Sequence, residues 1–398
     1  RLLAMLNGEN EGVEVEAAPE CWQAAARLAA RALTPRGKLI RLAGPTGRPV
    51  ETAEDLQRAR GYVHVLLDSE RFIWPGVKAG HTWTSAGIEY TTVSLTPKIL
   101  IARHVLSEQE RSDVLREASP SFAASGEKHY SAAFQDWRTS ETSMVRGDLD
   151  AALRRRSTAV LRLGRASQAE GAQVTRYTAG KWYRDHQDYF VDTDKEPQQR
   201  RLRAWLAKLR PKLTEEIRAN LTARGLQRLL PDHPEFDGAL MELVQSRLEV
   251  REREMSFSLR DWLDASPMAA ARAVAAWEET VGLRSLCFRR ALFDNRFATI
   301  FVYLNEDFEH GETALTNVLN PRAAAAAANA SEVSFGVQRE GVPECSKGLA
   351  IRPRAGDGLL FYNMRRTMLP DVYTNHAACP PKSGVKHGLN LWTWIRPE

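Results

Sequence analysis

The chain has 398 residues, more than one average domain contains, so we expect two domains or one domain with a large insertion. Hydrophobic residues make up 43% and charged residues 26%, which is typical of a globular protein with a sizeable core. The net charge of +5 is spread without a basic face, which argues against a nucleic-acid binder, and no apolar run approaches the roughly 20 residues of a transmembrane segment.

Residues 1–75 have the pattern of a small α+β unit. Two short strands around the turn Asn7-Gly8 precede an alanine-rich helical segment and further strands, in the order ββαβ(α)β. This order predicts a ubiquitin-like β-grasp domain. Its phrases Gly47-Arg48-Pro49-Val50 and Asp55-Leu56 resemble the doublecortin-type version of that fold, which implies a cytoskeletal partner. A docking or accessory β-grasp without affinity for tubulin is the alternative, because a fold does not determine a function.

The rest of the chain divides by composition. Residues 76–96 are rich in glycine, threonine and serine, and we expect a linker there. From 97 to 398, short strands between glycine and proline turns predict a mainly β domain, a β-sandwich or jelly roll, with flanking helices. The stretch 297–304 is almost continuously apolar, which predicts a strand buried on both faces. Residues 192–285 are highly charged with helical spacing, which predicts a helical insertion.

A possible metal site lies in the segment Lys181–Phe190. If this segment is a strand, His186 and Asp188 project from the same face and can bind one ion together. His376, in a distant strand-like segment, could supply a third ligand. Two histidines and one carboxylate leave other positions on the ion open, which suits non-haem Fe(II) and its oxygen chemistry. Taken alone, His-x-Asp is more often a chance surface pair.

A basic residue follows this candidate site. Lys386 lies ten residues beyond His376, where its ammonium could reach the far carboxylate of a dicarboxylate cosubstrate. Such a pair forms a charge-assisted hydrogen bond in a pocket of low dielectric constant. A solvated surface lysine is the alternative.

From about Pro97 to Ile395, without the insertion, the chain resembles the catalytic domain of the Fe(II)- and 2-oxoglutarate-dependent prolyl 4-hydroxylases. The matching phrases, in chain order, are Tyr183-Arg184-Asp185-His186-Gln187-Asp188-Tyr189-Phe190, Asn295-Arg296-Phe297-Ala298-Thr299, Tyr303-Leu304-Asn305, Gly311-Glu312-Thr313, and His376-Ala377-Ala378-Cys379-Pro380 leading to Gly384-Val385-Lys386. The resemblance implies a double-stranded β-helix, the jelly roll of these enzymes.

The resemblance also implies roles for single residues. The catalytic iron ligands would be His186, Asp188 and His376, and 2-oxoglutarate would be bound by Lys386 with help from Tyr177 and Thr299. The peptide groove would be lined by Arg138, Tyr183 and Trp392, each of which could equally be a packing residue.

The implied activity is hydroxylation of peptidyl proline by O2. It is coupled to oxidative decarboxylation of 2-oxoglutarate to succinate and CO2, with Fe(II) and ascorbate as cofactors. A dioxygenase that acts on another side chain or on a small molecule is one alternative. A scaffold protein that binds a cytoskeletal or docking partner through residues 1–75, with an inert oxygenase domain, is another.

Some residues depart from the family pattern. His387 stands where the family usually has Trp, Trp394 replaces a groove histidine, and His310 replaces a glycine, so peptide recognition need not be that of a collagen-type enzyme. Cys345 and Cys379 match family cysteines that can pair. A disulfide would suggest an oxidising compartment such as the endoplasmic reticulum lumen. A doublecortin-like domain would suggest the cytoplasm, so the compartment stays open.

Overall fold

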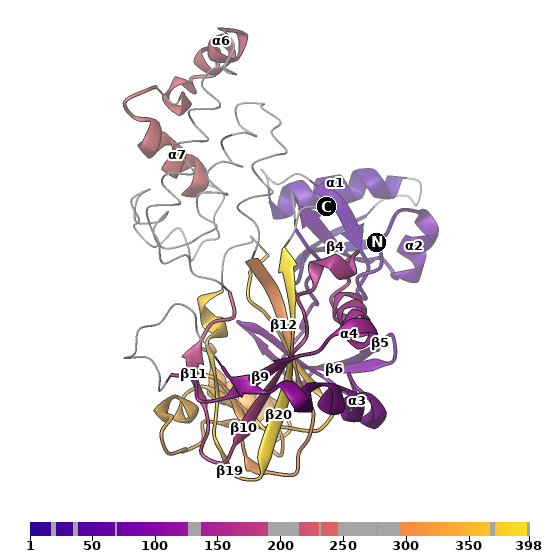
Figure 1. Ribbon diagram of the computed structural model, residues 1–398. Coiled ribbons are helices and arrows are strands. Elements are labelled where there is room, and N and C mark those ends of the chain that lie inside the picture. The colour runs from indigo at the N-terminus through magenta and orange to yellow at the C-terminus, as the bar shows by residue number, and fades with distance from the viewer. Residues whose placement is uncertain are drawn as a thin grey trace. The chain divides into compact units, whose positions relative to one another are not determined.

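The computed structural model describes residues 1–16, 21–34, 39–67, 70–125, 137–189, 215–230, 232–245, 277, 295–366 and 371–395 (Figure 1). The chain forms two compact units. The first comprises Arg1–Asp188, Arg296–Arg366 and Asp371–Trp394, and the second comprises Tyr189–Asn295, Thr367–Pro370 and Ile395–Glu398. No helix in the described ranges is long and apolar enough to cross a bilayer.

Within the second unit, the described part of the predicted insertion is helical. It contains α6 (Glu215–Ala223) and α7 (Phe236–Gln245). The remainder of the predicted insertion 192–285, apart from Trp277 and short turns beside these helices, lies outside the described residues.

The N-terminal residues form a four-stranded sheet with two helices. Its strands are β1 (Leu2–Leu6), β2 (Gly12–Val15), β3 (Leu39–Ala43) and β4 (Tyr62–Leu67), in the spatial order β2-β1-β4-β3 with β1 and β4 parallel. Helix α1 (Trp22–Leu33) packs on this sheet through small buried side chains such as Ala25 and Ala29. Helix α2 (Ala53–Arg58) begins with a capping box between Thr52 and Asp55. The doublecortin-type resemblance stays a prediction.

The segment that follows β4 joins this sheet to the rest of the first unit. Phe72, Ile73 and Trp74 are all buried. The Trp74 indole donates a hydrogen bond to the carbonyl of Val160 at 2.8 Å, and its backbone N–H donates to the Tyr362 hydroxyl at 3.0 Å. Residues on both sides of this segment therefore share one compact unit.

A nine-stranded sheet forms the larger layer of the main domain, in the order β5-β6-β7-β17-β12-β20-β10-β9-β8. Its strands are β5 (Thr82–Ser85), β6 (Ile88–Leu95), β7 (Lys98–Ala102), β8 (Ala123–Ala124), β9 (Glu141–Met144), β10 (Gln173–Thr178), β12 (Asn295–Tyr303), β17 (Gly358–Tyr362) and β20 (Val385–Ile395). In β12, Phe297, Ala298 and Ile300 are fully buried, which confirms that this strand is covered on both faces.

The prediction of a linker at 76–96 is wrong, because β5 and β6 occupy most of it. Gly87, with a φ of +79°, makes the tight turn between the two strands. The threonines and serines are strand residues here, and Tyr90 and Val93 are buried. Composition suggested a loop, but β-branched side chains also favour strands.

A five-stranded sheet faces the large one, in the order β11-β18-β14-β16-β15. Its strands are β11 (Tyr183–His186), β14 (Thr313–Leu315), β15 (Val333–Phe335), β16 (Leu349–Ile351) and β18 (His376–Ala378), and a separate pair is β13 (Glu309–His310) with β19 (Pro381–Ser383). Along the chain, β10, β12, β17 and β20 of the large sheet interleave with β11, β14, β16 and β18 of the small one. This alternation confirms the predicted double-stranded β-helix.

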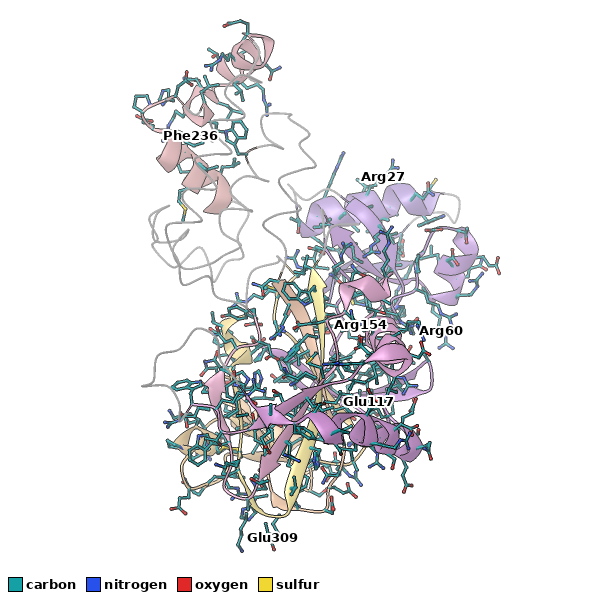
Figure 2. All side chains as sticks on the ribbon, viewed as in Figure 1. Arg27, Arg60, Glu117, Arg154, Phe236 and Glu309 are labelled. Carbon is teal, nitrogen blue, oxygen red and sulfur yellow. A yellow bond between two sulfur atoms is a disulfide. The ribbon has the colours of Figure 1, made fainter. Side chains whose placement is uncertain are left out.

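Three helices accompany the two sheets: α3 (Glu108–Ala118), α4 (Gly147–Val160) and α12 (Pro321–Ala327). Charged side chains such as Arg27 on α1, Glu117 on α3 and Glu309 on β13 lie exposed on different faces (Figure 2). The apolar core lies between the sheets, where Ile99, Leu349 and Phe361 pack in one cluster.

Candidate metal centre and active site

His186, Asp188 and His376 converge, as the sequence predicted. One ligand atom of each lies within 4.8 Å of the others. Nε2 of His186 is 3.9 Å from Oδ1 of Asp188, and Nε2 of His376 is 3.8 Å from Oδ2 of the same carboxylate. The convergence follows from sheet topology, because β11 and β18 are neighbours and His186 pairs directly with His376.

Backbone carbonyls hold both imidazoles in the orientation that a metal needs. Nδ1 of His186 lies 2.8 Å from the carbonyl oxygen of Arg184, and Nδ1 of His376 lies 3.0 Å from that of Thr374. A carbonyl only accepts, so each Nδ1 carries the proton and each Nε2 presents a lone pair. The donor set of two imidazole nitrogens and one carboxylate therefore fits a divalent transition metal.

The charge states of these ligands also favour a cation. Burial lowers the pKa of His186 well below its usual range, so its imidazole is neutral at pH 7. Burial alone would raise the pKa of Asp188, but interactions with its neighbours, among them the charge of Arg296 and the hydrogen bond from Thr299, lower the value to about 2. A neutral imidazole and an ionised carboxylate are the forms that bind metal.

A buried chain of side chains fixes the Asp188 carboxylate. The Thr299 hydroxyl donates to Oδ2 of Asp188 at 2.7 Å, and Nδ2 of Asn363 donates to the Thr299 hydroxyl at 3.0 Å. Thr299 and Asn363 are 1% and 0% exposed, so water does not compete for these bonds. The hydroxyl proton of Thr299 is thus used in the hydrogen bond to Asp188, and the predicted contact of Thr299 with 2-oxoglutarate stays a prediction.

Lys386 is fully buried, and its ammonium has no hydrogen-bond partner among the described residues. Nζ lies 5.4–5.6 Å from the ring centres of Phe301, Tyr177 and Tyr303. Burial lowers its pKa to about 7, although the negative charge of Glu312 counteracts this. A buried ammonium without a partner is costly, so the site fits an anionic ligand that supplies one.

Strand β12 connects the ammonium with the metal ligands. Side chains at alternate positions share a face, and on one face of β12 Thr299 contacts Asp188 while Phe301 and Tyr303 border Lys386. Thr299 and Phe301 are two residues apart, about 7 Å along a strand. A short dicarboxylate could therefore reach from a bound ion to the ammonium.

Comparisons with known proteins agree with this geometry. No family model matches the chain. Over 102 residues it is 32% identical to a probable prolyl 4-hydroxylase 4 of Arabidopsis thaliana, and over 101 residues it is 36% identical to a probable prolyl 4-hydroxylase 3 of the same plant. Over this quarter of its length the chain is similar in sequence to plant prolyl 4-hydroxylases. The two matches cover 25% of this chain and 31% of each relative, so the chain spans about a third of the length of these curated relatives.

Solved structures with similarity include prolyl hydroxylases. A viral collagen prolyl hydroxylase from Paramecium bursaria Chlorella virus-1 gives a TM-score of 0.34 at 15% identity, over 74% of this chain and 94% of that one. A prolyl hydroxylase from Trichoplax adhaerens, in complex with a hypoxia inducible factor peptide, gives 0.33 at 12% identity, over 75% and 84%. The jelly-roll assignment rests on the sheet topology described above.

Of the three residues predicted for the peptide groove, Tyr183 contacts a candidate metal ligand directly, whereas Arg138 and Trp392 are linked to the site through Tyr183 and Arg296. The Tyr183 ring stacks on His186 with a centroid distance of 3.5 Å, and the Arg138 guanidinium lies 4.6 Å from the Tyr183 ring centre. Trp392 packs under the guanidinium of Arg296 at 3.6 Å. That guanidinium also donates to the backbone carbonyl of Asp188 at 3.3 Å. These positions are compatible with the predicted role, which stays a prediction.

Several residues of the site escaped the sequence reasoning. Tyr303 borders Lys386, and its hydroxyl donates to Thr313 at 2.8 Å. Glu312, which raises the pKa of Lys386, is itself paired with Arg339. Asn363 has no counterpart in the predicted set. Tyr303 could have been found from the sequence. It lies four residues after Thr299 in a predicted strand, so the two side chains share one face.

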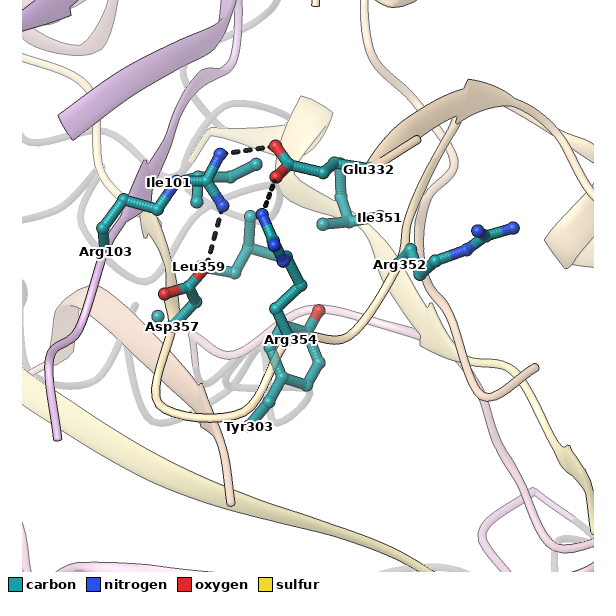
Figure 3. A pocket seen from close by; sticks show the side chains of 10 residues that line it. Ile101, Arg103, Tyr303, Glu332, Ile351, Arg352, Arg354, Asp357 and Leu359 are labelled. Carbon is teal, nitrogen blue, oxygen red and sulfur yellow. Dashed lines mark hydrogen bonds and ion pairs between the residues drawn. The ribbon is translucent and has the colours of Figure 1, made fainter. Parts of the chain in front are cut away.

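A small cavity among the described residues shares Tyr303 with this site but contains none of the three residues His186, Asp188 and His376. It is lined by Ile101, Arg103, Tyr303, Glu332, Ile351, Arg352, Arg354, Asp357, Gly358 and Leu359 (Figure 3). Its charges satisfy one another: Arg103 pairs with Glu332 and with Asp357, and Arg354 pairs with Glu332, whereas the side chain of Arg352 points away. The charged residues that line this cavity therefore form an ion-pair network with a structural role.

Cys345 and Cys379 form a disulfide with a Cα separation of 6.0 Å. It lies in a small core cluster with Ala314, Val342 and Ala377, beside the strand that begins with His376.

Proposed function

We propose that the chain is an Fe(II)- and 2-oxoglutarate-dependent dioxygenase that hydroxylates peptidyl proline. One observation carries the proposal: the buried His-Asp-His group and the unpartnered ammonium of Lys386 lie along the same face of β12. A metal site alone would fit many chemistries. A buried cation that lacks an anion beside it fits an acidic cosubstrate as well.

In this proposal His186, Asp188 and His376 hold Fe(II), and Lys386 binds the distal carboxylate of 2-oxoglutarate. When bound, these cofactors supply the oxidation, in which O2 converts a substrate C–H to C–OH while 2-oxoglutarate yields succinate and CO2. The protein holds the ligands and excludes water. The Phe361 ring, for example, packs 4.9 Å from the His376 ring, and both side chains are buried.

A proline-containing peptide is the substrate class we propose. The plant relatives are named prolyl 4-hydroxylases, and one structural neighbour was solved with a peptide. Tyr183, which stacks on His186, would contact this peptide together with Arg138 and Trp392. Aromatic faces and a guanidinium are suited to a proline ring and a peptide backbone.

A second substrate class is favoured by Trp394. It stands where the related enzymes have a groove histidine, and its indole donates to Glu170 at 3.0 Å. Glu170 is also paired with Arg296, so this part of the surface is committed to internal contacts. If the contacts of Trp394 and Arg296 with Glu170 take the place of a contact with a peptide, the substrate would be a different side chain or a small molecule.

The test is release of succinate from 2-oxoglutarate with Fe(II) and ascorbate, with and without a pool of proline-rich peptides. Peptide masses are read in the same samples, and His376→Ala serves as the metal-site control. We expect peptide-stimulated succinate and a mass gain of one oxygen on proline. Succinate without peptide oxidation would favour the second substrate class. No succinate in any sample, with metal bound, would refute the proposed activity.

A further inference from the structure

The two segments that carry the metal ligands are joined irregularly by their backbones. Tyr183 lies opposite Ala378 and His186 lies opposite His376, so three steps along β11 correspond to two along β18. Asp188 lies beyond the end of β11. Because the pairing of β11 with β18 is irregular, main-chain hydrogen bonds alone do not fix the distance between His186 and His376.

Side chains adjacent to the ligands supply a second connection. Nδ2 of Asn375 donates to Oδ2 of Asp185 at 2.9 Å, and Nε2 of Gln187 donates to Oδ1 of Asn375 at 2.5 Å. Asn375 immediately precedes His376, whereas Asp185 and Gln187 flank His186. The carboxamide of Asn375, next to His376, therefore contacts the residues on both sides of His186.

A third strand anchors this group. The Thr316 hydroxyl donates to Oδ1 of Asp185 at 2.7 Å, and the Thr316 N–H donates to the carbonyl of Asn375 at 3.0 Å. Thr316 follows β14, in which Leu315 pairs with His376. Both carboxylate oxygens of Asp185, and both the oxygen and the nitrogen of the Asn375 carboxamide, therefore take part in hydrogen bonds among these four residues. All four residues are partly buried, which strengthens such bonds over exposed ones.

We propose that Asp185, Gln187, Asn375 and Thr316 form a clamp that positions the metal ligands by fixing the separation of β11 and β18. None of the four touches the metal ligand atoms, so they are positioning residues. The inference rests on the metal site of the proposed function but not on its substrate. Its consequence is that metal affinity and metal geometry depend on the complementarity between Asp185 and Asn375.

The clamp can be tested by exchanging its two central residues. In Asn375→Asp, a second carboxylate faces Asp185 and the donor between them is lost, so the clamp opens by repulsion. In the double variant Asp185→Asn with Asn375→Asp, the residue at 185 accepts from Thr316 and donates to 375, which still accepts from Gln187. The double variant thus restores every side-chain hydrogen bond of the clamp, with the direction of the bond between positions 185 and 375 reversed.

Binding of Co(II) to the full chain is the measurement, followed by its visible absorption spectrum and by the melting temperature of the metal-free protein. We expect Asn375→Asp to weaken binding by about tenfold and to shift the Co(II) bands, and the double variant to restore both. A purely structural role would lower the melting temperature and leave the spectrum unchanged. Unchanged affinity and spectrum in Asn375→Asp, or no recovery in the double variant, would overturn the proposal.

If Asn375→Asp does not fold, Thr316→Val takes its place, because it removes one donor from outside the ligand segments. A smaller loss of Co(II) affinity with shifted bands is expected, and wild-type binding would refute the clamp. This readout is independent of turnover. A failed hydroxylation assay with intact Co(II) binding would count against the proposed function alone.

Discussion

The hydroxyl of Thr299 donates a 2.7 Å hydrogen bond to Oδ2 of Asp188, although the two residues are 111 positions apart in the chain. Asn363 in turn donates to Thr299 from β17's end, so three segments determine the orientation of one carboxylate. Partners that orient a metal ligand commonly contribute to metal affinity as much as to stability.

We therefore expect Thr299→Val to weaken metal binding by roughly 10–100-fold. Valine has nearly the shape of threonine but removes the donor to Asp188 and the acceptor for Asn363. Thr299→Ser keeps the hydroxyl and is the matched control, which should bind close to the wild type. Titration with Mn(II) or Co(II) distinguishes the variants. Equal affinities in valine and serine variants would show that the bond does not orient the ligand.

Binding of 2-oxoglutarate should depend on pH through Lys386. The ammonium must be protonated to pair with a carboxylate, and its pKa in the free protein is about 7. Affinity should therefore be constant below pH 7 and fall by about tenfold for each unit above it, with uptake of one proton on binding. Calorimetry in buffers of different ionisation enthalpy measures this proton. Binding that is independent of pH from 6 to 9 would contradict the role of Lys386.

Replacement of Lys386 by methionine should stabilise the protein when no cosubstrate is present. The buried ammonium has a pKa lowered from 10.5 to about 7, so charging it costs free energy in the folded state. We expect Lys386→Met to raise the free energy of unfolding at pH 7 by roughly 1–4 kcal/mol, because an apolar side chain of similar volume removes this cost.

The same variant has a distinct pH profile. Between pH 7 and 10.5 the unfolded wild type binds more protons than the folded one, so its stability should rise with pH. Lys386→Met should lack this rise and should gain no thermal stability from added 2-oxoglutarate. Denaturant unfolding at several pH values tests both points. A destabilised methionine variant would imply that the ammonium has a partner in the folded protein.

The ion-pair network of Figure 3 should be essential for stability and irrelevant to metal binding. Glu332 is 5% exposed and pairs with both Arg103 and Arg354. Glu332→Ala leaves these guanidinium groups without that carboxylate, and we expect a loss of roughly 3–5 kcal/mol. Glu309→Ala is the matched control, since it breaks an exposed pair with Lys382 and should change stability by less than about 0.5 kcal/mol.

Unfolding by urea gives both values, and a Co(II) titration checks the site. Equal stability losses in the two variants would mean that the buried network contributes no more than a surface ion pair.

The convergence of His186, Asp188 and His376 could be predicted because part of its signal is local. His186 and Asp188 are two positions apart, and His376 and Lys386 are ten positions apart within recognisable flanking phrases. The jelly roll could be predicted because short strand-like segments alternate with glycine and proline turns along the sequence. In each case the residues involved are close together in sequence or belong to a known order of phrases.

The supporting residues could not be predicted, because their partners are distant in sequence. Asn363 contacts Thr299 across 64 positions, and Asn375 contacts Asp185 across 190. Asparagine is common on protein surfaces, and the residues around Asn363 and Asn375 in the sequence give no indication of the partners Thr299 and Asp185. The segment 76–96 was predicted wrongly for a related reason, since the partners that join it to the large sheet, β6 for β5 and β7 for β6, cannot be read from a composition that also suits a loop.

The pairing of β6 with β7 determines where the protein can be shortened. A protein that began at residue 97 would expose β7, with Ile99 and Ile101, as an unpaired edge, and such edges recruit strands from other molecules. It would also remove Trp74 and leave the buried Tyr362 hydroxyl without its backbone partner. Shortened versions of the protein intended for crystallisation or kinetics should therefore begin before residue 70, so that β6 stays paired with β7 and Trp74 is kept.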